Sequence, residues 1–253
     1  MVAVVTGASD GIGMEMAKIL GSLGFDLILA ARREKELSQL CYAIAKKFHV
    51  SAQAFVCDLS KEEDCRRLHA YCKGRDVRVF INNAGRGVIG PFLETDLDAE
   101  MEMLRLNILS THLLFKLFSG SMENGFILNV ASMAAFQETP LMAAYGATKA
   151  YLYHLSSSVN YEFRKQGKPV HVATLCPGSV ATGFDKAAGV PHPLSGMSAS
   201  ECAEAAIYGM FRGRSVIIPG TKEKLARLAV KLLPREIILP MEYRIQGKKL
   251  GIF

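Results

Sequence analysis

Seven short runs of hydrophobic, often β-branched residues alternate along this chain with longer stretches in which apolar residues recur at helical spacing. Near-continuous apolar strands separated by helices are typical of a parallel sheet that is covered on both faces. We therefore predict an α/β fold with a doubly wound, seven-stranded parallel sheet. The predicted strands are Val2–Val5, Asp26–Ala30, Ala52–Cys57, Arg78–Asn82, Phe126–Val130, Val170–Leu175 and Ser215–Ile218. The predicted helices are Gly13–Leu23, Glu34–Phe48, Lys61–Cys72, Ala99–Phe118, Tyr145–Arg164 and Ala199–Phe211.

The length and composition fit one domain. The chain has 253 residues, of which half are hydrophobic, and this is enough to bury the core of a single α/β domain. No internal repeat and no linker-like change of composition divides it, so residues 1–253 are predicted to form one domain.

Two segments depart from the alternation of strands and helices. Residues 180–200 carry Gly, Pro and Ser without clear periodicity and follow the sixth strand, where a long loop at the carboxyl edge of the sheet binds ligands in such folds. Residues 221–253 form a basic amphipathic segment that Pro234 and Pro240 are expected to interrupt.

Net charge and cysteine content limit which partners and which cellular compartment the sequence predicts. The net charge of +6 comes from scattered Lys and Arg without a stacking platform, which favours an ordinary basic surface and no nucleic-acid partner. The six cysteines form no CxxC pair and no Cys/His cluster with metal spacing, so we predict reduced thiols and no metal site. The first residues lack a secretory signal and no apolar run reaches the ~18–20 residues of a membrane span, which predicts a cytoplasmic protein.

A glycine-rich turn follows the first predicted strand and opens a helix. Glycines at such a turn let the backbone approach a pyrophosphate, whose charge meets the free N–H groups at the start of the helix. The spacing is G-x-x-x-G-x-G instead of the common G-x-G-x-x-G. The candidate cofactor contacts here are Thr6, Gly7, Ser9, Asp10, Gly11, Ile12 and Gly13.

The end of the second strand bears on the choice of cofactor. NAD sites commonly place an acidic residue there to accept hydrogen bonds from the ribose hydroxyls, but this chain has Ala31 followed by Arg32 and Arg33. Guanidinium groups suit a phosphate. The pair therefore favours NADP(H), with NAD(H) still possible, although two Arg residues that merely begin a solvated helix would look the same.

Tyr145 and Lys149 lie four residues apart on one predicted helix and so share a face. A phenol is a poor base at neutral pH, and a nearby ammonium together with an oxidised nicotinamide would draw its pKa towards the working range. Ser132 follows the fifth strand and places a hydroxyl at the same edge of the sheet. A Tyr-x-x-x-Lys pair alone is common on helix surfaces, so the chemistry depends on the other motifs.

These motifs occur in the order and spacing of the short-chain dehydrogenase/reductase family, which the chain resembles over essentially its whole length. The form of the motifs is most similar to that of NADP(H)-dependent 17β-hydroxysteroid dehydrogenase-like and 3-ketoacyl reductase-like members of the family. The matching residues are Thr6–Gly13, Asp58-Leu59, Asn82-Asn83-Ala84-Gly85, Asn107, Ser132, Tyr145 with Lys149, and Pro177-Gly178-Ser179-Val180-Ala181-Thr182. The resemblance implies a Rossmann fold.

The resemblance also implies roles for individual residues. Tyr145 would be the acid/base, Ser132 would orient the carbonyl, Lys149 would hold the nicotinamide ribose, and Asn107 would support a water relay from Lys149 to solvent. The remaining cofactor contacts implied are Arg32, Arg33, Asp58, Leu59, Asn83, Ala84, Gly85, Pro177, Gly178, Val180 and Thr182. Asp10 departs from the pattern, because many NADP(H)-dependent members carry Lys or Arg there, and its carboxylate would weaken phosphate binding.

The predicted function is an NADP(H)-dependent oxidoreductase that interconverts a ketone or aldehyde and its alcohol, and that forms a homodimer or homotetramer as family members usually do. Phe184, Val190, Leu194 and Met197 indicate a fairly apolar substrate, which leaves hydroxysteroids, 3-ketoacyl chains and other carbonyl compounds open. A catalytically idle dinucleotide-sensing or scaffold protein on the same fold is the alternative. Residues 221–253 could pack on another subunit, cover the substrate pocket or lie on a membrane surface.

Overall fold

A computed structural model describes residues 1–193 and 195–253, so Leu194 of the predicted apolar loop lies outside the described residues. Seven strands form one sheet with the order β3-β2-β1-β4-β5-β6-β9, and every neighbouring pair is parallel. The predicted fold class is confirmed. The strands are β1 (Val2–Thr6), β2 (Asp26–Ala31), β3 (Ala52–Val56), β4 (Val77–Asn82), β5 (Gly125–Val130), β6 (Val170–Leu175) and β9 (Val216–Ile217).

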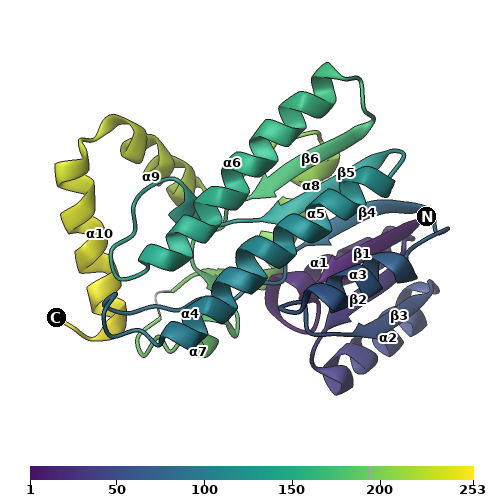
Figure 1. Cartoon of the computed structure of the whole chain (residues 1–253), viewed down its shortest axis with the longest axis horizontal. Helices are drawn as coiled ribbons and strands as arrows, with labels where there is room; N and C mark the ends of the chain where they lie inside the picture. Colours follow the sequence, from purple (N-terminus) through teal and green to yellow (C-terminus); the bar gives the residue numbers. More distant parts are fainter. Residues whose placement is uncertain (194) are drawn as a thin grey trace.

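Helices cover both faces of the sheet (Figure 1). The helices α1 (Gly11–Ser22), α2 (Glu34–Phe48) and α8 (Ala199–Phe211) pack on one face, where alternate strand residues such as Val5 and Leu29 form the core. On the other face α3 (Glu62–Tyr71), α5 (Thr111–Ser121) and α6 (Ala143–Lys165) pack against Val4, Ile28 and Phe80. Because side chains alternate along each strand, the apolar runs supply both cores at once.

The long helix predicted over Ala99–Phe118 is divided. It consists of α4 (Leu97–Leu104), a π-helical turn over Arg105–Ser110, and α5. The wider turn changes the pattern of backbone hydrogen bonds. Two backbone carbonyl groups of this turn accept from side-chain hydroxyls: Ser110 Oγ donates to Arg105 O and Thr111 Oγ1 donates to Leu106 O, both at 3.0 Å. Apolar spacing does not distinguish α from π turns, so the sequence pattern missed it.

The two segments without strand-helix alternation have structure of their own. The loop 180–200 contains a two-stranded parallel ladder of β7 (Val180–Ala181) and β8 (Met197–Ser198), with the short helix α7 (Phe184–Ala187) between them. The segment 221–253 forms α9 (Thr221–Leu232) and α10 (Arg235–Leu250). Pro234 separates the two helices as expected, but the interruption predicted at Pro240 is wrong, because α10 continues through it.

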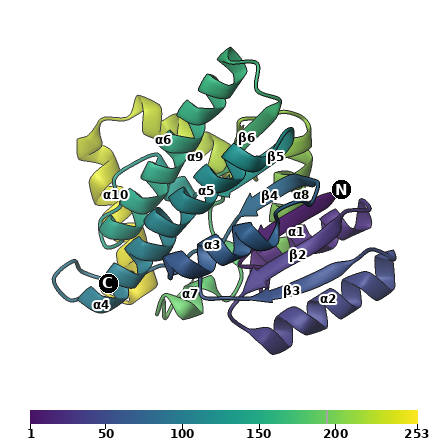
Figure 2. The same cartoon turned by 45° about the vertical axis from the view of Figure 1, so that its right-hand side comes forward.

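The helices α9 and α10 lie at the end of the molecule opposite α2 and β3 (Figure 2). Among the described residues, no helix is both long and apolar enough to cross a membrane. All six cysteines are buried free thiols.

Candidate active site

A cleft of about 1460 Å³ opens at the carboxyl edge of the sheet. It lies where the strand order reverses: β2 and β3 follow on one side of β1, and β4, β5 and β6 follow on the other. This switch point is where ligands bind in doubly wound sheets. The cleft extends from the turn after β1, past the end of β5 and the start of α6, to the inner sides of α9 and α10. Nineteen of the residues predicted from the sequence line it: Gly7, Ser9, Asp10, Gly11, Ile12, Arg32, Arg33, Asp58, Leu59, Asn83, Ala84, Gly85, Ser132, Tyr145, Lys149, Pro177, Gly178, Val180 and Thr182.

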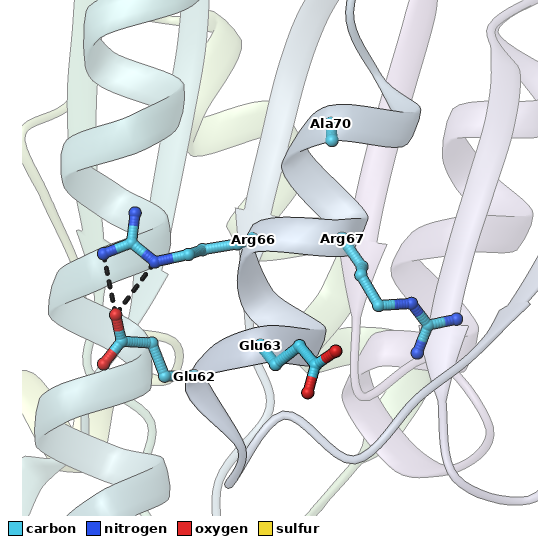
Figure 3. A pocket seen from close by; sticks show the side chains of 5 residues that line it. All are labelled: Glu62, Glu63, Arg66, Arg67 and Ala70. Atoms are coloured by element: carbon cyan, nitrogen blue, oxygen red, sulfur yellow. Dashed lines mark hydrogen bonds and ion pairs between the residues drawn. The ribbon is translucent and has the colours of Figure 1, made fainter.

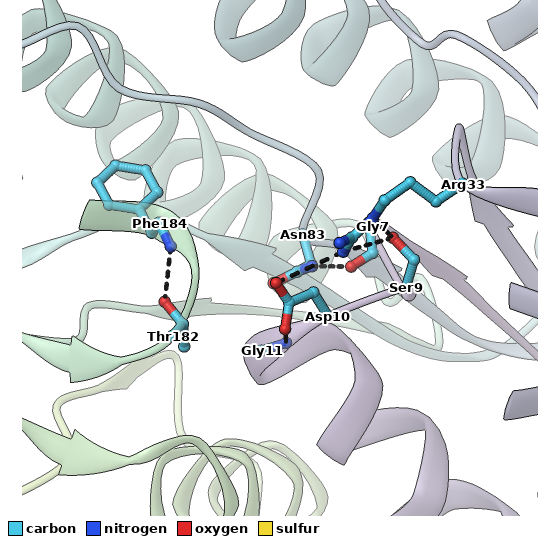
Figure 4. A network of polar contacts seen from close by, with 8 residues as sticks. All are labelled: Gly7, Ser9, Asp10, Gly11, Arg33, Asn83, Thr182 and Phe184. Carbon is cyan, nitrogen blue, oxygen red and sulfur yellow. Dashed lines mark hydrogen bonds and ion pairs between the residues drawn. The ribbon is translucent and has the colours of Figure 1, made fainter. Parts of the chain in front are cut away.

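The glycine-rich turn is held by the turn after β4 (Figure 4). Asn83 Nδ2 donates to Thr6 O at 2.9 Å and to Gly7 O at 3.2 Å, while Thr6 Oγ1 accepts from the backbone N–H groups of Asn83 and Ala84. A Cβ on Gly13 would lie 2.5 Å from Asn83 Nδ2, so only glycine fits there. Thr6 and Gly13 therefore support the turn from behind and do not line the cleft.

The start of α1 points into the cleft. Asp10 caps the helix, since its Oδ1 accepts from Gly11 N at 2.7 Å, and Gly11 and Ile12 line the cleft beside it. A twelve-residue helix presents unpaired N–H groups and a positive dipole end at this point. The turn therefore has the donor set that a pyrophosphate requires.

The two arginines after β2 are placed differently. The Arg33 guanidinium donates to Ser9 Oγ at 3.2 Å from both Nε and an Nη, and lies 3.4 Å from the Asp10 carboxylate (Figure 4). Arg32 lines the cleft close to Asp58. Burial raises the pKa of Asp58, but hydrogen bonds from Ser60 and the charges of Arg32 and Lys61 outweigh it, so its pKa is lowered. The Asp10 carboxylate thus pairs with Arg33 in the protein without a cofactor.

Ser132, Tyr145 and Lys149 come together at the end of β5. Ser132 caps a short 3₁₀ turn (Met133–Ala135), with its Oγ accepting from Ala134 N at 3.2 Å. Tyr145 and Lys149 lie one turn apart in α6, both buried, with Lys149 Nζ 5.7 Å from the centre of the Tyr145 ring. Lys149 Nζ donates to Val130 O at 2.9 Å, which directs the ammonium to the carboxyl end of β5.

Burial controls the charge of both groups. It raises the pKa of Tyr145 to about 12, against a lowering by the hydrogen bond of Ser132, while Asp185 raises it further. Burial also lowers the pKa of Lys149 to about 8, against a small rise caused by Cys176. The lowering expected from the sequence involves the positive charge of an oxidised cofactor, so it stays a prediction. Tyr145 is held as a neutral phenol, which is the form that donates a proton.

Asn107 lies in the π-helical turn and is buried behind Lys149. Its Oδ1 accepts from Arg86 N at 3.0 Å, and its Nδ2 donates to Arg86 O at 2.9 Å and Thr148 Oγ1 at 3.2 Å. A Cβ on Gly85 would lie 3.2 Å from Asn107 Oδ1 and 3.4 Å from Lys149 Nζ, so the two side chains meet at this glycine. Asn107 thus connects the segment that follows β4, at Arg86, to α6 at Thr148, and it does not line the cleft.

The segment after β6 completes the opposite wall. Thr182 Oγ1 accepts from Phe184 N at 3.2 Å, and the Phe184 ring lies 5.5 Å from the Tyr145 ring. Phe184 therefore brings an apolar surface directly to the phenol. Val190 of the predicted apolar loop is buried, but its side chain does not line the cleft.

The sequence motifs did not identify the wall that α9 and α10 supply. Gln137 Nε2 donates to Glu242 Oε1 at 2.5 Å, Arg235 pairs with Glu138 at 2.7 Å, and His192 N donates to Lys249 O at 3.1 Å. These contacts attach α10 to both loops that border Tyr145. Helical spacing in residues 221–253 was visible in the sequence, but it does not tell which face meets the cleft.

A separate shallow depression of about 480 Å³ lies on α3 and is lined by four charged residues and Ala70 (Figure 3). Glu62 and Arg66 pair with each other at 2.7 Å, and all five lining residues belong to one helix. Nothing in it combines with the groups at the sheet edge, so we assign it no site.

Comparisons with known proteins agree with this geometry. A family model described as short chain dehydrogenase matches residues 1–190. Very-long-chain 3-oxoacyl-CoA reductase of Neurospora crassa is 36% identical over 178 residues, which are 67% of this chain and 54% of that protein. Hydroxysteroid dehydrogenase-like protein 1 of Gallus gallus is 33% identical over 186 residues, 71% of this chain and 56% of the relative.

Among solved structures, a short-chain dehydrogenase from Sphingobium yanoikuyae in complex with NADPH matches with a TM-score of 0.77 and 26% identity, over 92% of this chain and 96% of that one. The chain matches little more than half the length of the curated relatives named above. Since the family model covers well over half of the chain, this protein belongs to the short-chain dehydrogenase family.

Proposed function

We propose that the protein is an NADP(H)-dependent oxidoreductase that interconverts a carbonyl compound and its alcohol. The observation that carries the proposal is one cleft lined both by the glycine-rich turn with its two arginines and by Ser132, Tyr145 and Lys149. A nicotinamide dinucleotide would supply the hydride. The start of α1 would hold its pyrophosphate, and Arg32 with Arg33 would hold a ribose phosphate.

The residues of the chain then supply positioning and a proton. Ser132 and Tyr145 donate hydrogen bonds to the carbonyl oxygen, and Tyr145 gives up its proton as negative charge develops there. The pKa of Tyr145, raised by burial to about 12, supports the reductive direction because the group starts protonated. The buried Lys149 ammonium lies on the same helix face and stabilises the phenolate that is left.

The lining of the cleft supports an apolar substrate body. Ile89, Met142 and Phe184 stand near Tyr145, and Val230, Leu233 and Ile238 continue the apolar wall into α9 and α10. The names of the relatives, which refer to 3-oxoacyl-CoA and hydroxysteroid substrates, fit the same chemistry. We propose a carbonyl on an extended hydrocarbon body as the substrate class.

Tyr145→Phe tests the assignment. Removal of one hydroxyl should reduce kcat by at least ~10³-fold, because proton donation and part of the oxyanion stabilisation are lost together. NADPH affinity, measured by fluorescence titration, should stay within a few-fold. A Tyr151→Phe variant, which removes a phenol exposed on the same helix, is the matched control and should keep full activity.

Turnover retained in Tyr145→Phe would contradict the proposal. Tight NADPH binding by the native chain without turnover of any steroid, 3-oxoacyl or aromatic ketone would instead support the idle, dinucleotide-sensing alternative.

A further inference from the structure

The helix α9 presents its leucines to solvent. Leu225, Leu228 and Leu232 are 67%, 53% and 74% exposed and recur at i, i+3 and i+7, so they share one face of the helix. Within α9, whose twelve residues are all described, none is buried. A helix that packs on a soluble core usually turns its large apolar side chains inward, whereas these three leucines point to solvent.

The inward side of α9 is firmly placed, and it carries the polar Glu223 and Arg227 beside Val230 of the apolar cleft wall. Arg227 lies 4.6 Å from the centre of the Phe136 ring and within 3.4 Å of the Tyr153 hydroxyl, and its Nε is buried. Glu223, four residues before Arg227, is also partly covered and lines the cleft. These contacts fix the rotation of the helix, so the outward direction of the leucines is a property of the fold.

The helix α10 also exposes apolar residues. Ile237, Met241 and Ile245 recur at i, i+4 and i+8 and are each about half exposed. Met241 and Ile245 also line the cleft. Exposed apolar residues of α10 therefore lie at the edge of the substrate cleft, and both helices lie at the end of the molecule away from α2 (Figure 2). We call these six side chains, from Leu225 to Ile245, the outer apolar face.

The charge of this segment is concentrated. Residues 221–253 hold eight Lys and Arg against three Glu, which gives +5 of the net charge of +6 of the whole chain. Lys222, Lys224 and Lys231 are exposed in α9 itself, on the helix that carries the leucines. Leucines flanked by lysines are the arrangement that binds the boundary between lipid headgroups and acyl chains.

We propose that the outer apolar face docks on an anionic lipid bilayer. The leucines of α9 would enter the acyl boundary while the lysines contact anionic headgroups. A second copy of the chain is a poorer occupant. A two-fold dimer through this face would set two segments of charge +5 against each other. Docking needs no catalysis and does not depend on the proposed reaction.

One consequence rests on the proposed function. Because Met241 and Ile245 belong both to the docking face and to the cleft, the cleft opens where the bilayer would begin. A carbonyl compound dissolved in the bilayer could then pass to Tyr145 without crossing water.

Vesicle co-sedimentation of the full chain tests the proposal. The protein should pellet with vesicles of phosphatidylcholine mixed with phosphatidylglycerol and pellet less with phosphatidylcholine alone. High salt should reduce its binding to the mixed vesicles. The triple variant Leu225→Ser/Leu228→Ser/Leu232→Ser should lose at least about tenfold in partition coefficient, since three side chains no longer insert. Circular dichroism would verify that it remains folded.

The control removes equally exposed apolar side chains elsewhere, as Leu23→Ser/Tyr42→Ser/Tyr161→Ser, and should bind like the native chain. Absence of binding by the native chain to the mixed vesicles overturns the proposal, as does undiminished binding by the triple variant. A native dimer that the triple variant converts to a monomer, without vesicle binding, would assign the face to a second copy. A failure of the Tyr145→Phe test would leave all of these outcomes unchanged.

Discussion

At the scale of single residues, the candidate site contains two groups whose pKa values are shifted by burial. Burial raises the pKa of Tyr145 to about 12, and it lowers the pKa of Lys149, whose ammonium donates to Val130 O, to about 8. The raised pKa favours the proton-donor role proposed for Tyr145. The lowered phenol pKa inferred from the sequence would require the positive charge of an oxidised cofactor in addition.

Cofactor preference gives the sharpest test at this scale. Arg32→Ala should weaken NADPH binding by about 10- to 100-fold and leave NADH nearly unchanged, because one charge-assisted phosphate contact is lost. Asp10→Asn should instead strengthen NADPH binding several-fold, since the carboxylate 3.4 Å from Arg33 is neutralised while asparagine still caps α1. Titrations with both nucleotides measure the ratio.

Glu15→Gln is the control for the aspartate change, because it removes a charge from α1 where Glu15 pairs with Lys18 and does not line the cleft. It should leave both affinities unchanged. Equal effects of Arg32→Ala on NADPH and NADH would contradict the NADP(H) preference.

At the scale of elements, α10 is attached to the loops on either side of the phenol. Glu242 accepts from Gln137, and Gln137 belongs to the segment that joins Ser132 to Tyr145. The pair between Arg235 and Glu138 is exposed on both sides and contributes little. Buried Ile238, the Glu242 contact and the hydrogen bond from His192 N to Lys249 O therefore contribute more to holding the apolar wall in place.

Glu242→Ala should loosen that wall. Loss of a charge-assisted hydrogen bond should raise the KM for an apolar carbonyl substrate by about tenfold, with NADPH affinity unchanged, because the nucleotide turn lies at the other end of the cleft. Glu236→Ala removes the same charge from an exposed position on the same helix and should leave KM unchanged. A parallel loss of NADPH affinity in Glu242→Ala would show that α10 acts on the whole cleft.

The sequence predicted what depends on neighbours along the chain. All seven strands were placed within a residue or two, since each is a short apolar run, and the motifs at their carboxyl ends were predicted to share one edge because parallel strands end together. Residues whose position depends on packing between distant segments were missed. The Gln137 to Glu242 contact spans 105 residues, and no local pattern encodes it.

At the scale of the whole molecule, burial of the thiols makes stability depend on pH. Burial raises the pKa of Cys41, Cys65 and Cys72 to about 11, and that of Cys57, Cys176 and Cys202 to about 12, from an ordinary value of 9.0. A group whose pKa is raised in the folded state gives stability that is complete below its unfolded pKa and is lost as pH rises towards the folded value. Lys149 acts in the opposite direction above about pH 8, but it is one group against six.

The native chain should therefore unfold at a clearly lower urea concentration at about pH 10.5 than at about pH 8. For every pH unit above 9, each buried thiol lowers the free energy of unfolding by up to about 1.4 kcal/mol. Urea titrations in the presence of a reductant, followed by circular dichroism, measure the midpoints. The double variant Cys41→Ala/Cys202→Ala loses two of these thiols and should show a smaller decline between the two pH values, whatever its stability at the lower one. An equal decline in both proteins would place the alkaline sensitivity in other groups, such as the buried phenol of Tyr145, whose pKa is also raised.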